Sequence, residues 1–348
     1  MIFGSRRCFA WCVLGLAALW TPSVAAAEVN LYAAREAGLM APLLAGFTAR
    51  TGIKVNTVFL NTGLAERVAA EGASSPADML MVVDIAALTD LARRGLTQPV
   101  QSAEVTAAVP ATLRDPAGHW VALSLRARAI FVARDRLTDP PTYYEALAEP
   151  RWRGKLCMRA GQHPYNTALI AALISRHGEP ATAALLGGFK ANLAHRPSGG
   201  DRDVARDIMA GICDVGLANT YYAGLMLSGA GGAEQKRWGE AVRVVLPSFK
   251  AETGKEDGGT HVNVSGAAIA RHAPNRAEAF RLLEFLVSAE GQKIYAEANF
   301  EYPVRPGVPV HPILASFGIL KIDETPLPAI AAQREAASLL VDRTGLDR

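Results

Sequence analysis

The chain has 348 residues, half of them hydrophobic, which is enough for about two domains with buried cores. Its formal net charge of +3 is too small to indicate binding to nucleic acid or to an anionic membrane surface. The four cysteines have neither the number nor the spacing of a cysteine-rich metal site.

Residues 1–27 predict a secretory signal peptide. Arg6 and Arg7 precede an apolar run over residues 9–20, and small residues suited to cleavage stand at 25–27. The apolar run is too short to span a membrane comfortably. We therefore expect a soluble periplasmic protein, exported either by the Sec route or, because of the paired arginines, by the twin-arginine route.

The first part of the mature chain alternates strands and helices. Asp84 is well placed as the N-cap of one of these helices, and Gly95 follows its end. This alternation predicts an α/β fold with a mostly parallel sheet and helices on both faces. The expected strands are 29–33, 54–60 and 79–83, and the expected helices are 39–47, 64–71 and 85–94.

After two extended segments a second α/β unit begins. Two such units joined by more than one extended crossing predict two lobes around a cleft. The expected strands are 120–124, 129–133, 155–159, 213–218, 242–247 and 261–270, and the expected helices are 143–148, 166–177, 181–192, 202–210, 223–227, 276–287, 289–298 and 328–340.

Tyrosines stand at two strand ends of the second unit. Tyr221 and Tyr222 follow a buried strand, where both phenols can point into one crevice, and Tyr165 opens a helix after the preceding strand. A phenol with its ordinary pKa of about 10 stays neutral unless a strongly charged cation, such as a trivalent metal ion, displaces its proton. From the pair alone, ordinary half-buried tyrosines are the simpler interpretation.

Other polar residues occupy similar junctions. Arg35 and Glu36 follow the first strand, and helix N-termini nearby would favour anionic groups. Arg126 lies between two extended segments, where either an internal salt bridge or an anion contact would suit it. His163 is the one histidine close to a candidate tyrosine.

Cys157 and Cys213 are the cysteines of the mature chain, and each lies in a short apolar segment. In an oxidising compartment they are candidates for a disulfide, while two buried free thiols are the other possibility.

Over its whole mature length the chain resembles the periplasmic ferric-ion-binding proteins of bacterial ABC iron importers. The most specific segments are Asn219-Thr220-Tyr221-Tyr222, Gly200-Asp201-Arg202-Asp203-Val204-Ala205, Tyr165-Asn166, Leu125-Arg126-Ala127-Arg128 and Thr260-His261-Val262-Asn263-Val264-Ser265-Gly266-Ala267. The resemblance implies a type II periplasmic-binding-protein fold, hinged, with a central cleft. It implies an N-terminal lobe of residues 28–127 plus 251–303 and a C-terminal lobe of residues 128–250 plus 304–348.

The resemblance also implies the site. Tyr165, Tyr221 and Tyr222 match the phenolate ligands of Fe(III), the cargo, and Arg35 and Arg126 match positions that hold a synergistic anion such as carbonate, with Asn219 beside them. The implied partners are an inner-membrane permease and its ATPase, and the protein would act as a monomer.

The chain departs from the family at Glu36-Ala37, where many relatives carry His or His-Tyr. Glu36 is either a hard oxygen ligand or a solvated acid of the first helical turn, and Ala37 offers no ligand. We therefore expect a site that depends on the three tyrosines of one lobe plus an anion or water.

Two other functions fit the same architecture. A phosphonate, sulfate or small carboxylate could bind without metal through Arg35, Arg126 and helix N-termini. An exported enzyme using a tyrosine or Glu36 as acid or base is the second, but the sequence has no nucleophile elbow, phosphate loop, dinucleotide fingerprint or His-Glu-x-x-His motif.

Overall fold

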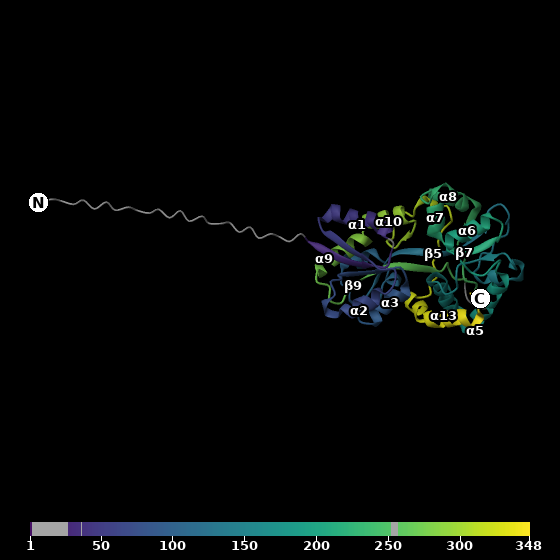
Figure 1. Cartoon of the computed structure of the whole chain (residues 1–348), viewed down its shortest axis with the longest axis horizontal. Coiled ribbons are helices and arrows are strands. Elements are labelled where there is room, and N and C mark those ends of the chain that lie inside the picture. Colours follow the sequence, from purple (N-terminus) through teal and green to yellow (C-terminus); the bar gives the residue numbers. More distant parts are fainter. Residues whose placement is uncertain (2–26, 36, 252–256) are drawn as a thin grey trace.

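The structure is a computed structural model that describes residues 1, 27–35, 37–251 and 257–348 (Figure 1). Residues 2–26 of the expected signal peptide, and Glu36, lie outside the described residues. Within the described ranges, no helix is both long enough and apolar enough to cross a membrane.

The strands of the described chain form one curled sheet with the main order β2-β1-β3-β9-β5-β7-β6. Strands β4 and β10 pair with β9 and β5, and β8 also pairs with β5. The bounds are β1 Glu28–Ala33, β2 Lys54–Phe59, β3 Met79–Val82, β4 Thr97–Gln98, β5 Val121–Ala133, β6 Leu156–Cys157, β7 Val215–Asn219, β8 Val242–Val245, β9 Val262–Ala270 and β10 Tyr302–Pro303.

Strand β5 links the two halves of the sheet. It pairs with β9 as far as Ala127 and with β7 from Arg128 onward. The two strands expected at 120–124 and 129–133 are therefore one, because all thirteen residues of β5 are buried and the arginines within it find partners inside the protein.

The sheet is mixed, and antiparallel pairings outnumber parallel ones among the described strands, so the expectation of mostly parallel strands was wrong. β1 is parallel to β2 and β3, and β6 is parallel to β7, as βα alternation predicts. The long strands β5 and β9 run antiparallel to each other and to their other main-path neighbours. These strands carry the chain between the two halves, so they do not follow the βαβ rule.

Helices cover both faces of the sheet, with α1 and α10 on one side of the first half and α2 and α3 on the other (Figure 1). The helices expected at 166–177 and 181–192 form one element, α5, that bends at Gly178 (φ 75°) just before Pro180. The bounds are α1 Ala37–Thr51, α2 Leu64–Glu71, α3 Ile85–Arg93, α4 Ala103–Ala108, α5 Pro164–Asn192, α6 Asp201–Met209, α7 Thr220–Ser228, α8 Gly232–Ala241, α9 Arg276–Val287, α10 Ala289–Asn299, α11 Pro312–Ala315, α12 Leu327–Ala332 and α13 Arg334–Thr344.

The apolar side chains gather in separate cores. One core contains the buried residues of β1, β3 and β9 with those of α1 and α9. The other two lie on opposite faces of β7, because its side chains alternate: Val215 and Leu217 pack with α5 and α13, and Ala218 packs with α6 and α7.

A disulfide joins Cys157 at the end of β6 to Cys213 just before β7, with their Cα atoms 5.9 Å apart. Gly216 of β7 lies against this junction, where a Cβ atom would stand 2.7 Å from the Cys157 carbonyl oxygen and 2.4 Å from Val204. Only glycine allows this close approach of β7 to β6 and α6. The strand that leads to Tyr221 is thus held covalently and sterically.

Candidate functional site

The three candidate tyrosines meet at one place. Tyr221 and Tyr222 lie in the first turn of α7, directly after β7, and Tyr165 is the second residue of α5. The hydroxyl oxygens of Tyr165 and Tyr221 are 3.2 Å apart, and the rings of Tyr221 and Tyr222 are stacked with centroids 4.1 Å apart. The structure thus brings the three side chains together, and the role of this cluster as a metal site stays a prediction.

Burial keeps the phenols of Tyr221 and Tyr222 protonated. It raises the pKa of Tyr221 well above 10, and the neighbouring Tyr165 and Tyr222 raise it further, while Arg126 opposes the shift. Burial likewise raises the pKa of Tyr222, assisted by Tyr165 and Asp201. These phenols therefore form phenolates at neutral pH only when a cation takes the place of their protons.

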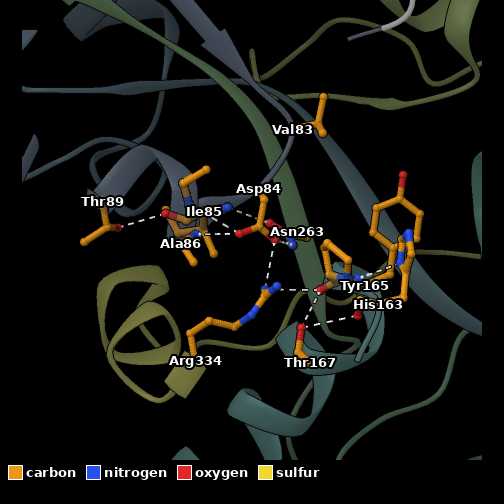
Figure 2. Close-up of polar contacts among 12 residues, drawn as sticks. Val83, Asp84, Ile85, Ala86, Thr89, His163, Tyr165, Thr167, Asn263 and Arg334 are labelled. Carbon is orange, nitrogen blue, oxygen red and sulfur yellow. Dashed lines mark hydrogen bonds and ion pairs between the residues drawn. The ribbon is translucent and has the colours of Figure 1, made fainter. Parts of the chain in front are cut away.

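A cleft of about 380 Å³ opens beside Tyr165. One wall is built from the first half of the chain and the other from the start of α5. Figure 2 shows His163 and Tyr165 across from Asp84 and Ile85, which begin α3. The lining residues are Ala34, Asn61, Thr62, Gly63, Leu64, Ala65, Glu66, Val82, Val83, Asp84, Ala87, Asp90, Leu91, His163, Pro164 and Tyr165.

His163 orients Tyr165. Its Nδ1 accepts the backbone N–H of Tyr165 at 3.2 Å, and its ring meets the Tyr165 ring edge-on at 4.5 Å. Burial, followed by the positive charge of Arg159, lowers the pKa of His163 to about 4. The imidazole is therefore neutral at physiological pH and can keep accepting that hydrogen bond.

Arg35 is held by protein groups. Its Nη1 donates to Ser265 Oγ and its Nη2 to Glu301 Oε1, each at 2.7 Å, in a buried ion pair. Burial is the largest influence on the Arg35 pKa and lowers it, but Glu301 and nearby tyrosines including Tyr221 raise it more, so the net shift is upward. Arg35 is charged, and its main partner is a carboxylate of the protein.

Arg126 lies next to the tyrosines. Its guanidinium carbon is 5.4 Å from the centre of the Tyr165 ring, and its Nη2 donates to the carbonyl oxygens of Val83 and Val264. Its buried Nε has no hydrogen-bond partner. Both predicted anion contacts therefore have a buried Nε without a hydrogen-bond partner, but within the described residues Arg126, unlike Arg35, makes no ion pair with a carboxylate.

Asn219 supports the strand end. Its backbone N–H donates to Asp201 at 2.7 Å, and its side-chain oxygen accepts from Arg128 at 3.1 Å. Arg128 also pairs with Asp201 at 2.6 Å and donates to Asn166, the residue after Tyr165. This buried network connects the two segments that carry the tyrosines, and Asn219 contributes through it.

Comparisons with known proteins show the family of the chain. The family described as bacterial extracellular solute-binding protein matches residues 74–316. Iron uptake protein A1 of Synechocystis sp. is 40% identical over 320 residues, covering 91% of this chain and 87% of the relative.

The chain belongs to the bacterial extracellular solute-binding protein family.

Solved structures match this solute-binding protein over nearly its whole length. A Bordetella ferric binding protein is 54% identical and superimposes with a TM-score of 0.86, covering 92% of this chain and 100% of the other. A Trichodesmium protein in complex with iron and citrate ligands is 37% identical with a TM-score of 0.84, covering 92% and 99%.

The solute-binding protein carries two further arginines at the site that the sequence analysis did not single out. The guanidinium carbon of Arg159 is 5.1 Å from the Tyr165 ring centre, and that of Arg202 is 5.0 Å from the Tyr222 ring centre. Arg202 does lie in a segment noted for its resemblance, but nothing in the sequence indicates its stacking on a ring twenty positions away.

A second group of potential metal ligands lies away from the cleft. One ligand atom each from Cys157, His195 and Asp207 lies within 4.8 Å of the others. The sulfur of Cys157 is bonded to Cys213, so it offers no thiolate, which is the form that binds metal. With the disulfide formed, this group does not compete with the tyrosines for a cation.

Proposed function

We propose that this protein is the periplasmic component of an ABC importer and that it captures ferric iron in the cleft beside Tyr165. The observation that carries the proposal is the convergence of three tyrosines, with Tyr165 and Tyr221 hydroxyls 3.2 Å apart. Three phenolates supply three negative charges and hard oxygen ligands, which suit Fe(III). The similarity to iron uptake protein A1 and to the Bordetella ferric binding protein supports the same cargo.

Tyr165, Tyr221 and Tyr222 bind the iron in this proposal, and an anion or water completes its coordination. A small anion such as carbonate, or a carboxylate, approaches through the unused donor of Arg126. The Trichodesmium relative, which holds iron with citrate, supports a carboxylate in this place. Glu36 stays a predicted further ligand, and Arg35 serves to order the adjacent wall through Glu301.

Delivery follows from closure of two lobes around the iron. The lobes comprise residues 28–127 with 251–303, and residues 128–250 with 304–348. Iron favours the closed arrangement because closure brings the charged groups of the first wall near the ion that the phenolates of the second wall hold, and the closed surface is recognised by an inner-membrane permease with its ATPase. The protein acts as an exported, soluble monomer without catalytic activity.

The test is metal analysis and a visible spectrum of the protein titrated with ferric citrate. The proposal predicts one iron per chain and a coloured phenolate-to-iron charge-transfer band that a strong chelator removes. Tight binding of phosphonate, sulfate or a carboxylate that is unaffected by chelators, with no colour on adding iron, would support the metal-free anion receptor instead. Turnover in a hydrolase screen would support an enzyme.

A further inference from the structure

The cleft is bridged at one edge by Arg334, the first residue of α13. Its Nη1 lies 3.5 Å from Asp84 Oδ2 and donates to the Pro164 carbonyl oxygen at 3.4 Å. Figure 2 shows this side chain extending between the start of α3 and the start of α5. Asp84 and Pro164 both line the cleft, on opposite walls, so one guanidinium contacts both walls at once.

Asp84 is firmly placed on the first wall. Its Oδ1 caps α3 by accepting the N–H groups of Ala86 and Ala87, and its Oδ2 accepts from Asn263 at 2.8 Å. Asn263 also accepts the Ile85 N–H at 3.0 Å. The carboxylate is thus fixed by three hydrogen bonds before Arg334 is counted, and it presents a rigid negative charge to the cleft edge.

Arg334 is equally well anchored on the second wall. Its helix α13 packs along α5 through Ala337, Leu340 and Val341, which share an apolar core with Leu169 and Leu173 of α5. Pro164, whose carbonyl it contacts, directly precedes Tyr165. The contact of Arg334 with the backbone therefore acts on the residue next to a proposed iron ligand.

We propose that Arg334 is a positioning residue that clasps Asp84 to the start of α5, holding the cleft closed and fixing Tyr165 against the iron. This proposal rests on the proposed function for its iron readout. Any opening that separates α3 from the start of α5 must break the contact of Arg334 with Asp84, because Arg334 and Pro164 belong to the same wall. The pair is partly exposed, at 28% for Arg334 and 13% for Asp84, so it can break and re-form rather than lock the protein permanently.

The first measurement is the rate of iron transfer from the loaded protein to excess ethylenediaminetetraacetate in Arg334→Gln and Asp84→Asn. Asparagine still caps a helix, so Asp84→Asn removes the charge without removing the cap. We expect release to accelerate roughly threefold to tenfold in each variant, as for a partly buried charge-assisted contact. The double variant should release iron no faster than the faster single variant, because both changes break the same clasp.

Arg343→Gln is the matched control, because Arg343 also lies on α13 but pairs with Glu179 of α5 on the outer surface. Its release rate should equal that of the unmodified protein, and Arg334→Lys should restore part of the lost retention. Additive effects of the two single variants, or release unchanged in Arg334→Gln, would overturn the clasp.

Small-angle scattering of the iron-free protein separates this proposal from the proposed function. Arg334→Gln should increase the radius of gyration, and Arg343→Gln should leave it unchanged. If the unmodified protein binds no iron, the proposed function fails. The scattering measurement still tests whether Arg334 holds the two walls together, because it uses the iron-free protein. An unchanged radius of gyration together with unchanged release would show that Arg334 does not hold the cleft.

Discussion

The two walls of the cleft differ in what they offer a cation. The second wall presents Tyr165, whose hydroxyl oxygen is 3.2 Å from that of Tyr221, and arginines stack on the rings of Tyr165 and Tyr222. The first wall presents Asp84, Glu66 and Asp90, each of which is paired with an arginine of the protein. Arg35, at the end of β1, is also paired.

This difference indicates that the second wall is the preassembled half of the site. A disulfide joins the end of β6 to the residue just before β7 begins, and Asp201 and Arg128 hydrogen-bond across the segments that carry Tyr165 and Tyr221. In the proposed function, iron would therefore meet its ligands on the second wall first. The first wall would then close over it, assisted by the proposed Arg334 clasp, and contribute charge balance more than ligands.

Among these predictions, acidification should produce the largest change in iron affinity. Because burial raises the pKa of both Tyr221 and Tyr222, iron must displace at least their two protons throughout the physiological range. Affinity therefore falls as pH falls, by about a hundredfold per pH unit for two protons. Competition for iron with a chelator of known pH dependence, measured between about pH 8 and about pH 5, checks how steeply the affinity falls with pH.

Substituting a single tyrosine comes next. Each of the variants Tyr165→Phe, Tyr221→Phe and Tyr222→Phe removes one proposed ligand while keeping the ring. Iron affinity should fall by more than about 100-fold, because mutating a residue that only orients a metal ligand already lowers metal affinity by up to about that factor. A variant that keeps full affinity would exclude that tyrosine from the ligand set. Chelator competition measures the loss.

Breaking the ion pair of the first wall should affect folding more than binding. Arg35→Gln leaves the Glu301 carboxylate buried with Ser124 as its remaining partner, which should lower the free energy of unfolding by roughly 3–5 kcal/mol. Urea unfolding measures this. Arg50→Gln, which breaks an exposed pair with Glu290, should change stability little. If Arg35→Gln instead abolished the effect of added carbonate on the iron charge-transfer band and left the free energy of unfolding unchanged, Arg35 would be an anion ligand.

Opening the disulfide should loosen the second wall. The bridge closes a loop of 56 residues, so replacing Cys157 and Cys213 by serine should cost roughly 2–4 kcal/mol of unfolding free energy. Thermal and urea unfolding of the double variant, compared with the oxidised protein, test this. Equal stability of the two proteins would remove the disulfide from the account of a preassembled wall.

The smallest effect concerns the arginine stacked on Tyr222. Arg202→Gln removes a cation at 5.0 Å from the ring and should weaken iron binding about two- to fivefold, with Arg202→Lys recovering part of the loss. Arg151→Gln is a suitable control, because Arg151 stacks on Trp152 at 4.7 Å, outside the residues that line the cleft. Equal losses in the two variants would mean that the stacking has no specific role at the site.

The sequence predicted the tyrosine wall because its signal is local. Tyr165 and Tyr221 each follow a strand and open a helix, and strand ends meet at one edge of the sheet. The partner of Arg35 could not be predicted in the same way, since Glu301 is 266 positions away and carries no motif. The single long strand β5 was missed because its arginines resemble a break until their buried partners are known.

Helices with a weak sequence signal also could not be predicted from the sequence. α8 begins among glycines and has few apolar residues, so it lacks a helical stripe, and the α5 bend at Gly178 was predicted as a gap between two helices. Glu36, predicted as a possible ligand, lies outside the described residues and stays a prediction.

The central claim is that three phenolates of one wall bind a single ferric ion. Resonance Raman spectroscopy, excited in the charge-transfer band of the iron-loaded protein, tests it most directly because it detects only tyrosinates bound to iron. The account predicts tyrosinate modes that weaken in Tyr165→Phe, Tyr221→Phe and Tyr222→Phe and persist in Tyr143→Phe, whose hydroxyl bonds Asp257 away from the cleft. Iron bound with no tyrosinate modes, or modes unchanged in all three variants, would contradict it.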